Sequence, residues 1–356
     1  MKKVTIKYLD EFFEDNLAKT IKNKHKLKKY YMNKMQYLSM AQERMNDVNY
    51  IIRNYNIFLI YEPKVRIVMS LNVVDKLVNH VFTKEVLIPA CESRLDIRNV
   101  ATRKNMGSSY GIKLLRKYIE YYKRNVGDNF YVLKLDISKY FYSIDHDVLK
   151  GMLRKILDDE DYIRVCNIID STNFEYINET IDKLEKKCTD KLPRYEKGKG
   201  LGIGNLSSQC LSVFYLSEID HYIVHNLGLK HYVRYMDDFI ILCDDKDRLY
   251  KALEIIKDKL FNEYKLKINK KKTFVKSAKE GFDFLGYRFL IKNNRTIQII
   301  KSSSYSKFKT RIKKNTYLFI NKQISISEYF NSLSNYSYSF NGSVMKTRWY
   351  IKRHLS

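Results

Sequence analysis

The sequence has little glycine and very little proline. Among its 356 residues there are 12 Gly and 3 Pro, well below the usual shares of about 7% and 5%. This scarcity excludes collagen-like and Gly/Pro-rich chains, and it favours long, uninterrupted helices and strands. Hydrophobic residues make up 45% of the chain and aromatic residues 14%, which is enough for a large core and excludes disorder along the whole chain.

Cysteine is also scarce. The 5 Cys residues include no CxxC pair, so we expect neither a disulfide framework nor a cysteine zinc site. The N-terminal segment carries acids where a signal peptide has its apolar core, and no apolar run reaches the roughly 18 residues that a membrane span needs. The sequence therefore predicts a cytoplasmic protein with no membrane partner.

Positive charge is what the sequence has in excess. Lys and Arg number 66 against 40 Asp and Glu, which gives a formal net charge of +26. Such a charge attracts polyanions and makes association salt-dependent, so we expect a nucleic acid as partner. The lysines between residues 19 and 34 fit either a solvated helix face or an arm that lies on an RNA or DNA backbone.

Hydrophobic periodicity divides the chain into helices, then a β-α-β-β-α-β pattern, then helices again. Helices are expected over residues 1–55, 72–90, 112–124, 145–170, 207–226 and 246–264. Strands are expected in a hairpin at 56–70 around Glu62-Pro63-Lys64, at 130–137, in a hairpin at 231–243, and as a pair at 282–290. Two further segments are expected, a loop with a short helix or hairpin at 171–197 and a helical module at 301–356.

Three carboxylates lie at predicted strand ends or turns: Asp136, Asp237 and Asp238. Two adjacent acids at the apex of an apolar hairpin repel each other, and a tight turn there would favour Asn-Gly. Divalent cations relieve such repulsion, and two Mg²⁺ ions about 3.5–4 Å apart need several hard oxygen ligands. We therefore predict a two-metal site for phosphoryl transfer in place of an ordinary acidic turn.

These carboxylates sit in motifs that resemble those of reverse transcriptases. Tyr235-Met236-Asp237-Asp238 is similar to the catalytic motif of the family, and residues 133–141 resemble its first catalytic strand. Residues 200–209 resemble the loop and helix start between those motifs. Residues 269–273, followed by Phe284-Leu285-Gly286-Tyr287, are similar to the lysine motif and the primer grip.

The resemblance, which runs from about residue 50 to about residue 300, implies an α+β fold. This is the right-hand polymerase, with fingers, a ferredoxin-like palm of antiparallel sheet and helices, and a small helical thumb. The expected division is a basic helical N-terminal extension at 1–55, fingers at 56–125, palm at 126–295 with a fingers insertion near 171–200, and a helical thumb at 296–356.

The resemblance also implies roles for single residues. Asp136 and Asp237 would bind both Mg²⁺ ions, for which Mn²⁺ is the expected substitute, while Asp238 would support them and the Ile137 carbonyl would complete the ligand set. Lys272 would act as general acid toward pyrophosphate, with the neighbouring lysines 270 and 271 as alternatives. Phe284 to Tyr287 would form the primer grip.

Further residues would bind the nucleotide. Arg66 would clamp the triphosphate, because a guanidinium suits bidentate phosphate contact; a solvated strand arginine is the alternative. Phe141 would exclude a ribose 2′-OH, and a core phenylalanine is the alternative. Gly204, next to Ile203, would let the backbone approach the nucleotide. Gln209, like Asn205 before it, would either touch template and nucleotide or cap a helix.

The loop departs from the Pro-Gln-Gly pattern of many family members. Gly202-Ile203-Gly204 places an apolar side chain where that pattern has an amide, so nucleotide selection is expected to differ. Together with Ser208-Gln209, this form resembles the enzymes of diversity-generating retroelements and of some defence-associated bacterial systems. Leu201-Gly202 stands where the retroelement enzymes often have Leu-Pro, which favours antiphage defence.

The resulting hypothesis is an RNA-directed DNA polymerase that adds deoxynucleotides to a 3′ or protein hydroxyl. Its partners would be an RNA template, the DNA product and deoxynucleoside triphosphates. Size and charge favour a dedicated structured non-coding RNA, with an accessory protein or oligomer as a further partner. The alternatives are a diversity-generating retroelement enzyme that makes error-prone cDNA, a template-independent DNA polymerase, and a non-catalytic RNA-binding scaffold.

Overall fold

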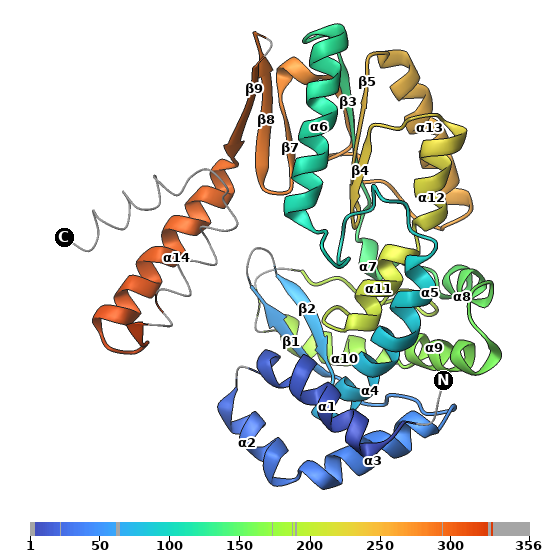
Figure 1. The fold of residues 1–356 in the computed structure, drawn as a ribbon, viewed down its shortest axis with the longest axis vertical. Helices are drawn as coiled ribbons and strands as arrows, with labels where there is room; N and C mark the ends of the chain where they lie inside the picture. The colour runs from blue at the N-terminus through green and yellow to red at the C-terminus, as the bar shows by residue number, and fades with distance from the viewer. Residues whose placement is uncertain are drawn as a thin grey trace.

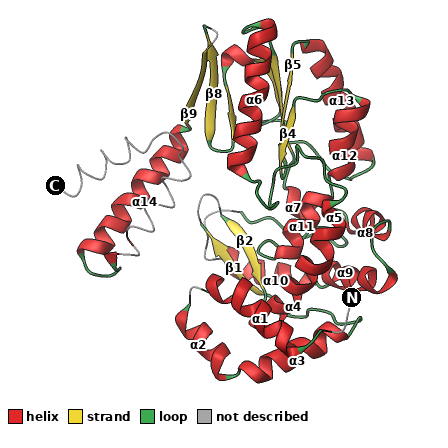
Figure 2. Cartoon of the chain, in the orientation of Figure 1, coloured by secondary structure: helices red, strands yellow, loops and turns green. Residues whose placement is uncertain are grey.

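The computed structural model describes residues 4–326 and 329, apart from 22, 62–64, 173, 187, 189, 190 and 294. Figure 1 shows a region of antiparallel sheets flanked by helices at one end of the long axis and a mainly helical region at the other. Figure 2 shows the same division by secondary structure, with a single short hairpin inside the helical region.

Four antiparallel strands form the central sheet. They are β3 (Tyr131–Asp136), β4 (Tyr232–Tyr235), β5 (Asp238–Cys243) and β6 (Phe274–Ser277). Their order across the sheet is β4-β5-β3-β6, and helical connections join β3 to β4 and β5 to β6. This is the ferredoxin-like β-α-β-β-α-β topology, so the predicted palm fold is confirmed.

Both faces of the central sheet are buried. Because successive side chains of a strand point to opposite faces, Leu133 shares one core with α13 (Lys246–Asn262), whereas Val132 shares a second core with α6 (Ser108–Val126). A second sheet belongs to that second core. Its strands, in order, are β7 (Phe282–Phe284), β8 (Tyr287–Lys292) and β9 (Arg295–Ile300). The pair predicted over 282–290 is therefore two strands of a three-stranded sheet.

The N-terminal helices pack into the same core as the central sheet. They are α1 (Ile6–Asn16), the 3-10 turn Ala18–Thr20, α2 (Lys24–Met32) and α3 (Lys34–Asn46), which lie beside α4 (Val73–Phe82). Phe13 of α1 stacks on Tyr30 of α2 with ring centroids 3.7 Å apart. One face of these helices is thus structural, while the lysines of α2 at 24, 26, 28 and 29 are exposed.

A β-hairpin lies beside these helices. Its strands are β1 (Asn56–Ile60) and β2 (Arg66–Ser70). The predicted hairpin is confirmed, although its expected turn at 62–64 lies outside the described residues. Residues 171–197, expected to form a loop with a short helix or hairpin, contain the 12-residue helix α10 (Phe174–Glu185). Ile177 of this helix shares a core with Ile67 of β2, so the insertion packs on the hairpin.

Several expected helices are divided into shorter ones. The helices after β3 are α7 (Tyr140–Ser143), α8 (His146–Arg154) and α9 (Asp159–Asp170). Those before β4 are α11 (Leu206–Phe214), α12 (Ser217–His221) and the π-helix Tyr222–Asn226, and α4 continues into the π-helix Thr83–Leu87 and α5 (Ile88–Glu92). Asp158 caps α9, because its carboxylate accepts the Asp161 N–H at 2.8 Å, and a new helix begins there.

The C-terminal part begins with α14 (Ser302–Ile320), which projects away from the sheets in Figure 1. It is helical, as expected for the thumb, but residues 327, 328 and 330–356 of the predicted thumb lie outside the described residues. The division into extension, fingers, palm and thumb stays a prediction. Within the described ranges, no helix combines the length and the apolar character needed to cross a bilayer.

A buried ion pair joins α12 to β4. Arg234 and Asp220 have fully buried side chains, and Nε and Nη2 of Arg234 donate to the two carboxylate oxygens at 2.6 Å each. The Tyr232 hydroxyl donates to Oδ1 of Asp220 at 2.6 Å, and Nη2 of Arg234 also donates to the Val213 carbonyl at 3.0 Å. This bidentate geometry offsets the cost of burying both charges.

We expect Asp220→Asn to lower the free energy of unfolding by about 3–5 kcal/mol, because it leaves a buried guanidinium without its counter-charge. Urea titration measures the loss. Glu218→Gln, an exposed acid on the same helix, is the matched control and should change stability by less than about 1 kcal/mol. Equal stability of the two variants would contradict the importance given to the buried pair.

Candidate active site

The pairing of β3 with β5 places three carboxylates at one end of the central sheet. Asp136, the last residue of β3, lies directly opposite Asp238, the first residue of β5. Opposed Cα atoms in antiparallel strands are about 4.5–5.5 Å apart. Asp237 lies in the turn between β4 and β5. The structure therefore brings together the three acids that the sequence singled out.

The turn that carries Asp237 has an uncommon backbone conformation. Met236 has a φ of +57°, which bulky side chains rarely adopt. Nη1 of Arg234 donates to the Met236 carbonyl at 2.9 Å. The buried Arg234–Asp220 pair thus also fixes the turn, which makes Arg234 a positioning residue for Asp237.

Asp136 is held by the segment that follows α13. Nζ of Lys272 lies 2.8 Å from Oδ1 and 3.0 Å from Oδ2 of Asp136. The Asn269 side-chain amide donates to Oδ2 at 3.0 Å, and the Asn269 N–H donates to the Asp136 carbonyl at 2.7 Å. The Thr273 hydroxyl accepts the Asp136 N–H at 3.3 Å. Of the three consecutive lysines left open by the sequence, Lys272 is the one that contacts this carboxylate.

The cation that contacts Asp238 within the described residues is Lys134. Nζ of Lys134, on β3, lies 3.2 Å from both carboxylate oxygens. Burial raises the pKa of Asp238 to about 6 even though the Lys134 charge opposes this shift. Burial also raises the pKa of Asp237, and the negative charge of Asp136 adds to the effect, whereas the charges of Lys272 and Arg66 oppose it. Burial therefore disfavours the charged form of these two carboxylates, and an added cation would stabilise it.

This cluster fits a divalent cation. Oδ1 of Asp238 is buried and receives no hydrogen bond, although the Lys134 ammonium is 3.2 Å away. Carboxylate oxygens are the hard ligands that Mg²⁺ and Mn²⁺ prefer. Next to Asp136, Ile137 forms an antiparallel β-bridge with Ile268 in the segment after α13. The backbone hydrogen bonds of this bridge use the Asp136 carbonyl and the Ser138 N–H. That bridge therefore does not use the Ile137 carbonyl, whose role as a ligand stays a prediction.

Two predicted nucleotide contacts lie near this cluster. Arg66 begins β2 with an exposed side chain, and its effect on the pKa of Asp237 places its charge within electrostatic range of the carboxylates. Phe141, in α7, is half-buried and packs against the main core. Its ring is thus partly a core side chain and partly accessible. Triphosphate binding by Arg66 and exclusion of a 2′-OH by Phe141 stay predictions.

The glycine-rich loop contacts the hairpin strand β2. The Met69 N–H donates to the Ile203 carbonyl at 2.8 Å. Gly204 has a φ of +120°, and a Cβ there would lie 2.8 Å from Cγ1 of Val68 and 3.2 Å from the Met69 carbonyl. The close backbone approach expected at Gly204 is therefore made to β2. Contact of Ile203 and Gly204 with a nucleotide stays a prediction.

Asn205 and Gln209 lie at the start of α11. Asn205 occupies the N-cap position, but its side chain makes no capping hydrogen bond. Gln209 lies inside the helix, where it is half-buried and cannot cap. The capping interpretation is therefore wrong for both residues, and contact of Gln209 with template or nucleotide stays a prediction.

The predicted primer grip forms the turn between β7 and β8. Its residues are Phe284, Leu285, Gly286 and Tyr287. The φ angles of Leu285 and Gly286 are +46° and +86°, as in a two-residue type I′ turn. The side chains of Phe284 and Tyr287 are buried, so the Leu285–Gly286 turn is the part that faces solvent. Lys134 links this hairpin to the carboxylates, because its Nζ also lies 2.7 Å from a carbonyl of β7.

The residues that hold the carboxylates in place were not predicted from the sequence. Lys134 and Arg234 are charged residues inside otherwise apolar strands, which is a signal that an acid lies nearby. Asn269 was recognised only as the start of a motif, and its two bonds to Asp136 depend on a turn that composition does not reveal. Asp220 had no signal of its own, since it lies in a helix outside the motifs that the sequence singled out.

Residues 62–289 match the family model described as "Reverse transcriptase (RNA-dependent DNA polymerase)", which is more than half of the chain. The chain belongs to the reverse transcriptase family. No curated protein matches the sequence.

Solved structures of telomerases are similar to this reverse transcriptase chain. Apo telomerase of Candida tropicalis superposes with a TM-score of 0.51 at 14% identity, over 75% of this chain and 52% of the telomerase chain. Telomerase of Candida albicans in complex with a fragment of telomeric RNA superposes with a TM-score of 0.48 at 16% identity, over 82% of this chain and 55% of the telomerase chain. The chain thus spans about half the length of these telomerases, and the first likeness shows a shared fold.

The ion pair of Lys272 with Asp136 gives a prediction about metal binding. Because a divalent cation at Asp136 must compete with the Lys272 ammonium, we expect Lys272→Ala to tighten Mn²⁺ binding several-fold, as measured by electron paramagnetic resonance of free Mn²⁺. Asp237→Asn should weaken it by about tenfold or more. Lys271→Ala, an exposed neighbour, should leave it unchanged. Equal affinities for the Lys271 and Lys272 variants would contradict this competition.

Proposed function

We propose that this chain is an RNA-directed DNA polymerase that extends a 3′ or protein hydroxyl with deoxynucleotides. The observation that carries the proposal is the convergence of Asp136, Asp237 and Asp238 at one end of a ferredoxin-like sheet, in a chain of the reverse transcriptase family. The Lys272 contact with Asp136 supports the same conclusion, since it places a proton donor beside the cluster.

In this proposal Asp136 and Asp237 hold two Mg²⁺ ions, with Mn²⁺ as a substitute, and Asp238 supports them. The ions supply activation of the attacking hydroxyl and stabilisation of the leaving oxygen. Asn269 and Thr273 fix Asp136 through its side chain and its peptide group, so the carboxylate needs little rearrangement. Preorganisation of this kind lowers the barrier to phosphoryl transfer.

The remaining residues act on the nucleotide. Arg66 contacts the triphosphate from the hairpin, and Lys272 gives a proton to the departing pyrophosphate. Phe141 closes the space that a ribose 2′-OH would occupy. Ile203, Gly204 and Gln209 border the nucleotide from the glycine-rich loop, and the Leu285–Gly286 turn holds the primer end.

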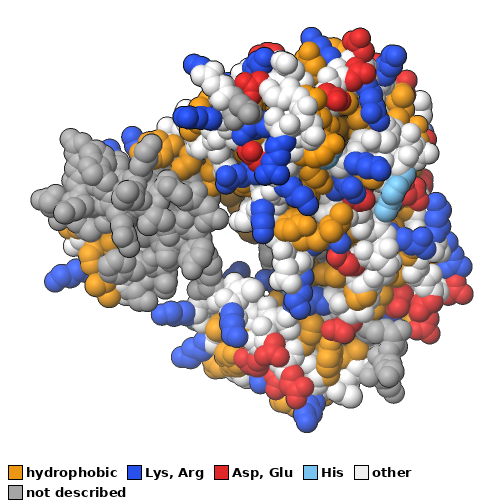
Figure 3. All heavy atoms as spheres, turned by 45° about the horizontal axis from the view of Figure 1, so that its top comes forward, with side chains coloured by type: hydrophobic (Ala, Val, Ile, Leu, Met, Phe, Trp, Pro, Cys, Tyr) orange, Lys and Arg blue, Asp and Glu red, His pale blue; other side chains and the backbone are white. Residues whose placement is uncertain are grey.

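The biological role that we propose is antiphage defence in bacteria, with a dedicated structured RNA as template. Support comes from the Gly202-Ile203-Gly204 form of the loop and from the net charge of +26. On the face shown in Figure 3, Lys and Arg side chains are spread over much of the middle of the view, and Asp and Glu gather mainly toward its margins. A diversity-generating retroelement enzyme is the alternative within the same branch.

Product analysis tests the polymerase function. The protein is purified together with its co-purifying RNA, supplied with Mg²⁺ and labelled deoxynucleotides, and the products are sequenced. We expect DNA complementary to the bound RNA, reduced on the order of 10²-fold or more in Asp237→Asn. Asp159→Asn, an acid with an 81% exposed side chain, is the matched control and should retain activity.

Each of the other possible results of this experiment would indicate one of the alternative functions. DNA with no complement in the bound RNA would indicate template-independent synthesis. Stable bound RNA without any DNA would indicate an RNA-binding scaffold. DNA that is complementary to the bound RNA but carries many dispersed errors would favour the retroelement alternative over defence.

Phe141 gives a separate prediction about sugar selection. We expect Phe141→Ala to lower the preference for deoxynucleotides over ribonucleotides by roughly tenfold or more in kcat/KM, because the ring no longer excludes the 2′-OH. Phe261→Ala, an exposed phenylalanine on α13, is the control. An unchanged preference in a folded Phe141→Ala protein would identify this ring as a core side chain only.

A further inference from the structure

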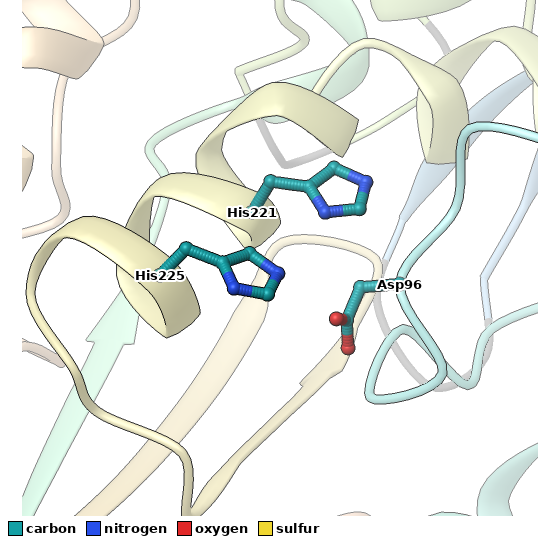
Figure 4. A group of neighbouring side chains, drawn as sticks. All are labelled: Asp96, His221 and His225. Carbon is teal, nitrogen blue, oxygen red and sulfur yellow. The ribbon is translucent and has the colours of Figure 1, made fainter.

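A second group of side chains that could ligate a metal ion comes from the loop beside Arg234 and from the helical segment that follows Asp220. Asp96, His221 and His225 each offer one ligand atom, and these atoms all lie within 4.8 Å of one another. Figure 4 shows the two imidazole rings, carried by one helical segment, and the Asp96 carboxylate of the facing loop turned toward a common point. None of these residues belongs to the catalytic cluster.

The helix explains why the two rings share a face. His221 ends α12 and His225 lies in the π-helix Tyr222–Asn226, four residues later, so both side chains project from the same side. Their rings are nearly parallel, with centroids 5.9 Å apart and an interplanar angle of 16°. Single-turn π-helices occur frequently at functional sites.

The His221 ring is held in the tautomer that a metal ligand needs. Its Nε2 lies 2.8 Å from the Arg94 carbonyl. A carbonyl can only accept, so Nε2 carries the proton and Nδ1 presents a lone pair toward the other two side chains. Ligating histidines commonly donate their second ring N–H to a carbonyl or carboxylate in this way.

The Asp96 carboxylate is positioned before any ion binds. The Arg98 N–H donates to Oδ1 at 2.8 Å, and Nη1 of Arg98 lies 3.1 Å from both oxygens. The Arg103 guanidinium donates to the Asp96 carbonyl at 2.7 Å. Oδ2 therefore receives one long bond only and retains a lone pair for a cation. The arginine becomes an outer partner of the ligating carboxylate.

We propose that Asp96, His221 and His225 form a site for a divalent transition-metal ion of the Zn²⁺ class. Two imidazole nitrogens and one carboxylate oxygen are a ligand set typical of Zn²⁺, and imidazole favours such ions over Mg²⁺. Ligand atoms around tetrahedral Zn²⁺ are about 3.3 Å apart. The three ligand atoms, which lie within 4.8 Å of one another, would have to move closer to that separation when an ion binds.

An ion at this site would stabilise the segments around Arg234, the residue that fixes the turn between β4 and β5. The loop that carries Asp96 runs beside β4, since the Arg234 N–H donates to the Arg98 carbonyl at 2.9 Å and the Val100 N–H donates to the Arg234 carbonyl at 3.0 Å. The helix that carries His221 also carries Asp220. Zn²⁺ would thus link the loop and the helix that together enclose Arg234.

Metal analysis tests the proposal with Zn²⁺ as the probe. Wild type, His221→Ala, His225→Ala and the control His25→Ala, which removes an exposed histidine on α2, are incubated with Zn²⁺ in millimolar Mg²⁺. The Mg²⁺ occupies carboxylate sites but competes poorly for imidazole. Bound Zn²⁺ is counted by mass spectrometry after desalting. Thermal unfolding of the same samples gives a second readout.

We expect wild type and His25→Ala to retain about one Zn²⁺ more than the two site variants. Zn²⁺ should also raise their Tm by roughly 2–4 °C or more, a shift that His225→Ala lacks. The same Zn²⁺ content in all four proteins, or none in any, would overturn the proposal. If His221→Ala does not fold, His225→Ala alone decides, because the exposed His225 ring is not part of the core.

Discussion

Repulsion among the three carboxylates at the end of the central sheet is the constraint on which the rest of this structure depends. Three cations reduce it, and each comes from a different part of the chain: Lys134 from β3, Lys272 from the segment after α13, and Arg66 from the hairpin. Burial raises the pKa values of Asp237 and Asp238 even though these cations oppose the shift, so a further cation would still stabilise the charged carboxylates. The site is therefore complete only when hairpin, sheet and C-terminal segment are assembled, and it still favours added cations.

The turn between β4 and β5 must hold its position against that repulsion. Arg234 does this from the inside of the fold, since one guanidinium bonds the Asp220 carboxylate, the Val213 carbonyl and the Met236 carbonyl. A lysine could not reach three acceptors in fixed directions, because only the planar guanidinium presents its donors as a fork. Packing of α11 and α12 against the sheet thus determines where the catalytic turn lies.

Much of the fold and of the candidate site could be predicted from local sequence patterns. The parts that could not be predicted depend on contacts between residues far apart in the chain. Two acids between two apolar runs, and a strand that ends in a third, were enough to predict the carboxylate cluster. The palm topology was predicted from the resemblance to reverse transcriptases, with which the order of helices and strands agreed. Which of the three lysines contacts Asp136 depends on the backbone conformation of the turn that begins at Asn269, and this conformation places Lys272 beside the carboxylate. For residues 171–197 the choice between a short helix and a hairpin stayed open, because the apolar positions of α10, such as Ile177, are separated by charged residues and pack on a strand more than a hundred residues earlier.

The docking of the N-terminal helices has a consequence for how this chain would meet a polyanion. Phe13 and Tyr30 stack inside the main core, so the lysine-rich face of α2 is fixed to the body of the protein. Flexible basic tails lose conformational entropy when they bind. A rigid face loses only side-chain freedom, and the spacing of its charges is set before the ligand arrives. Such preset spacing would favour a polyanion whose charges match it over a flexible strand that carries the same charge.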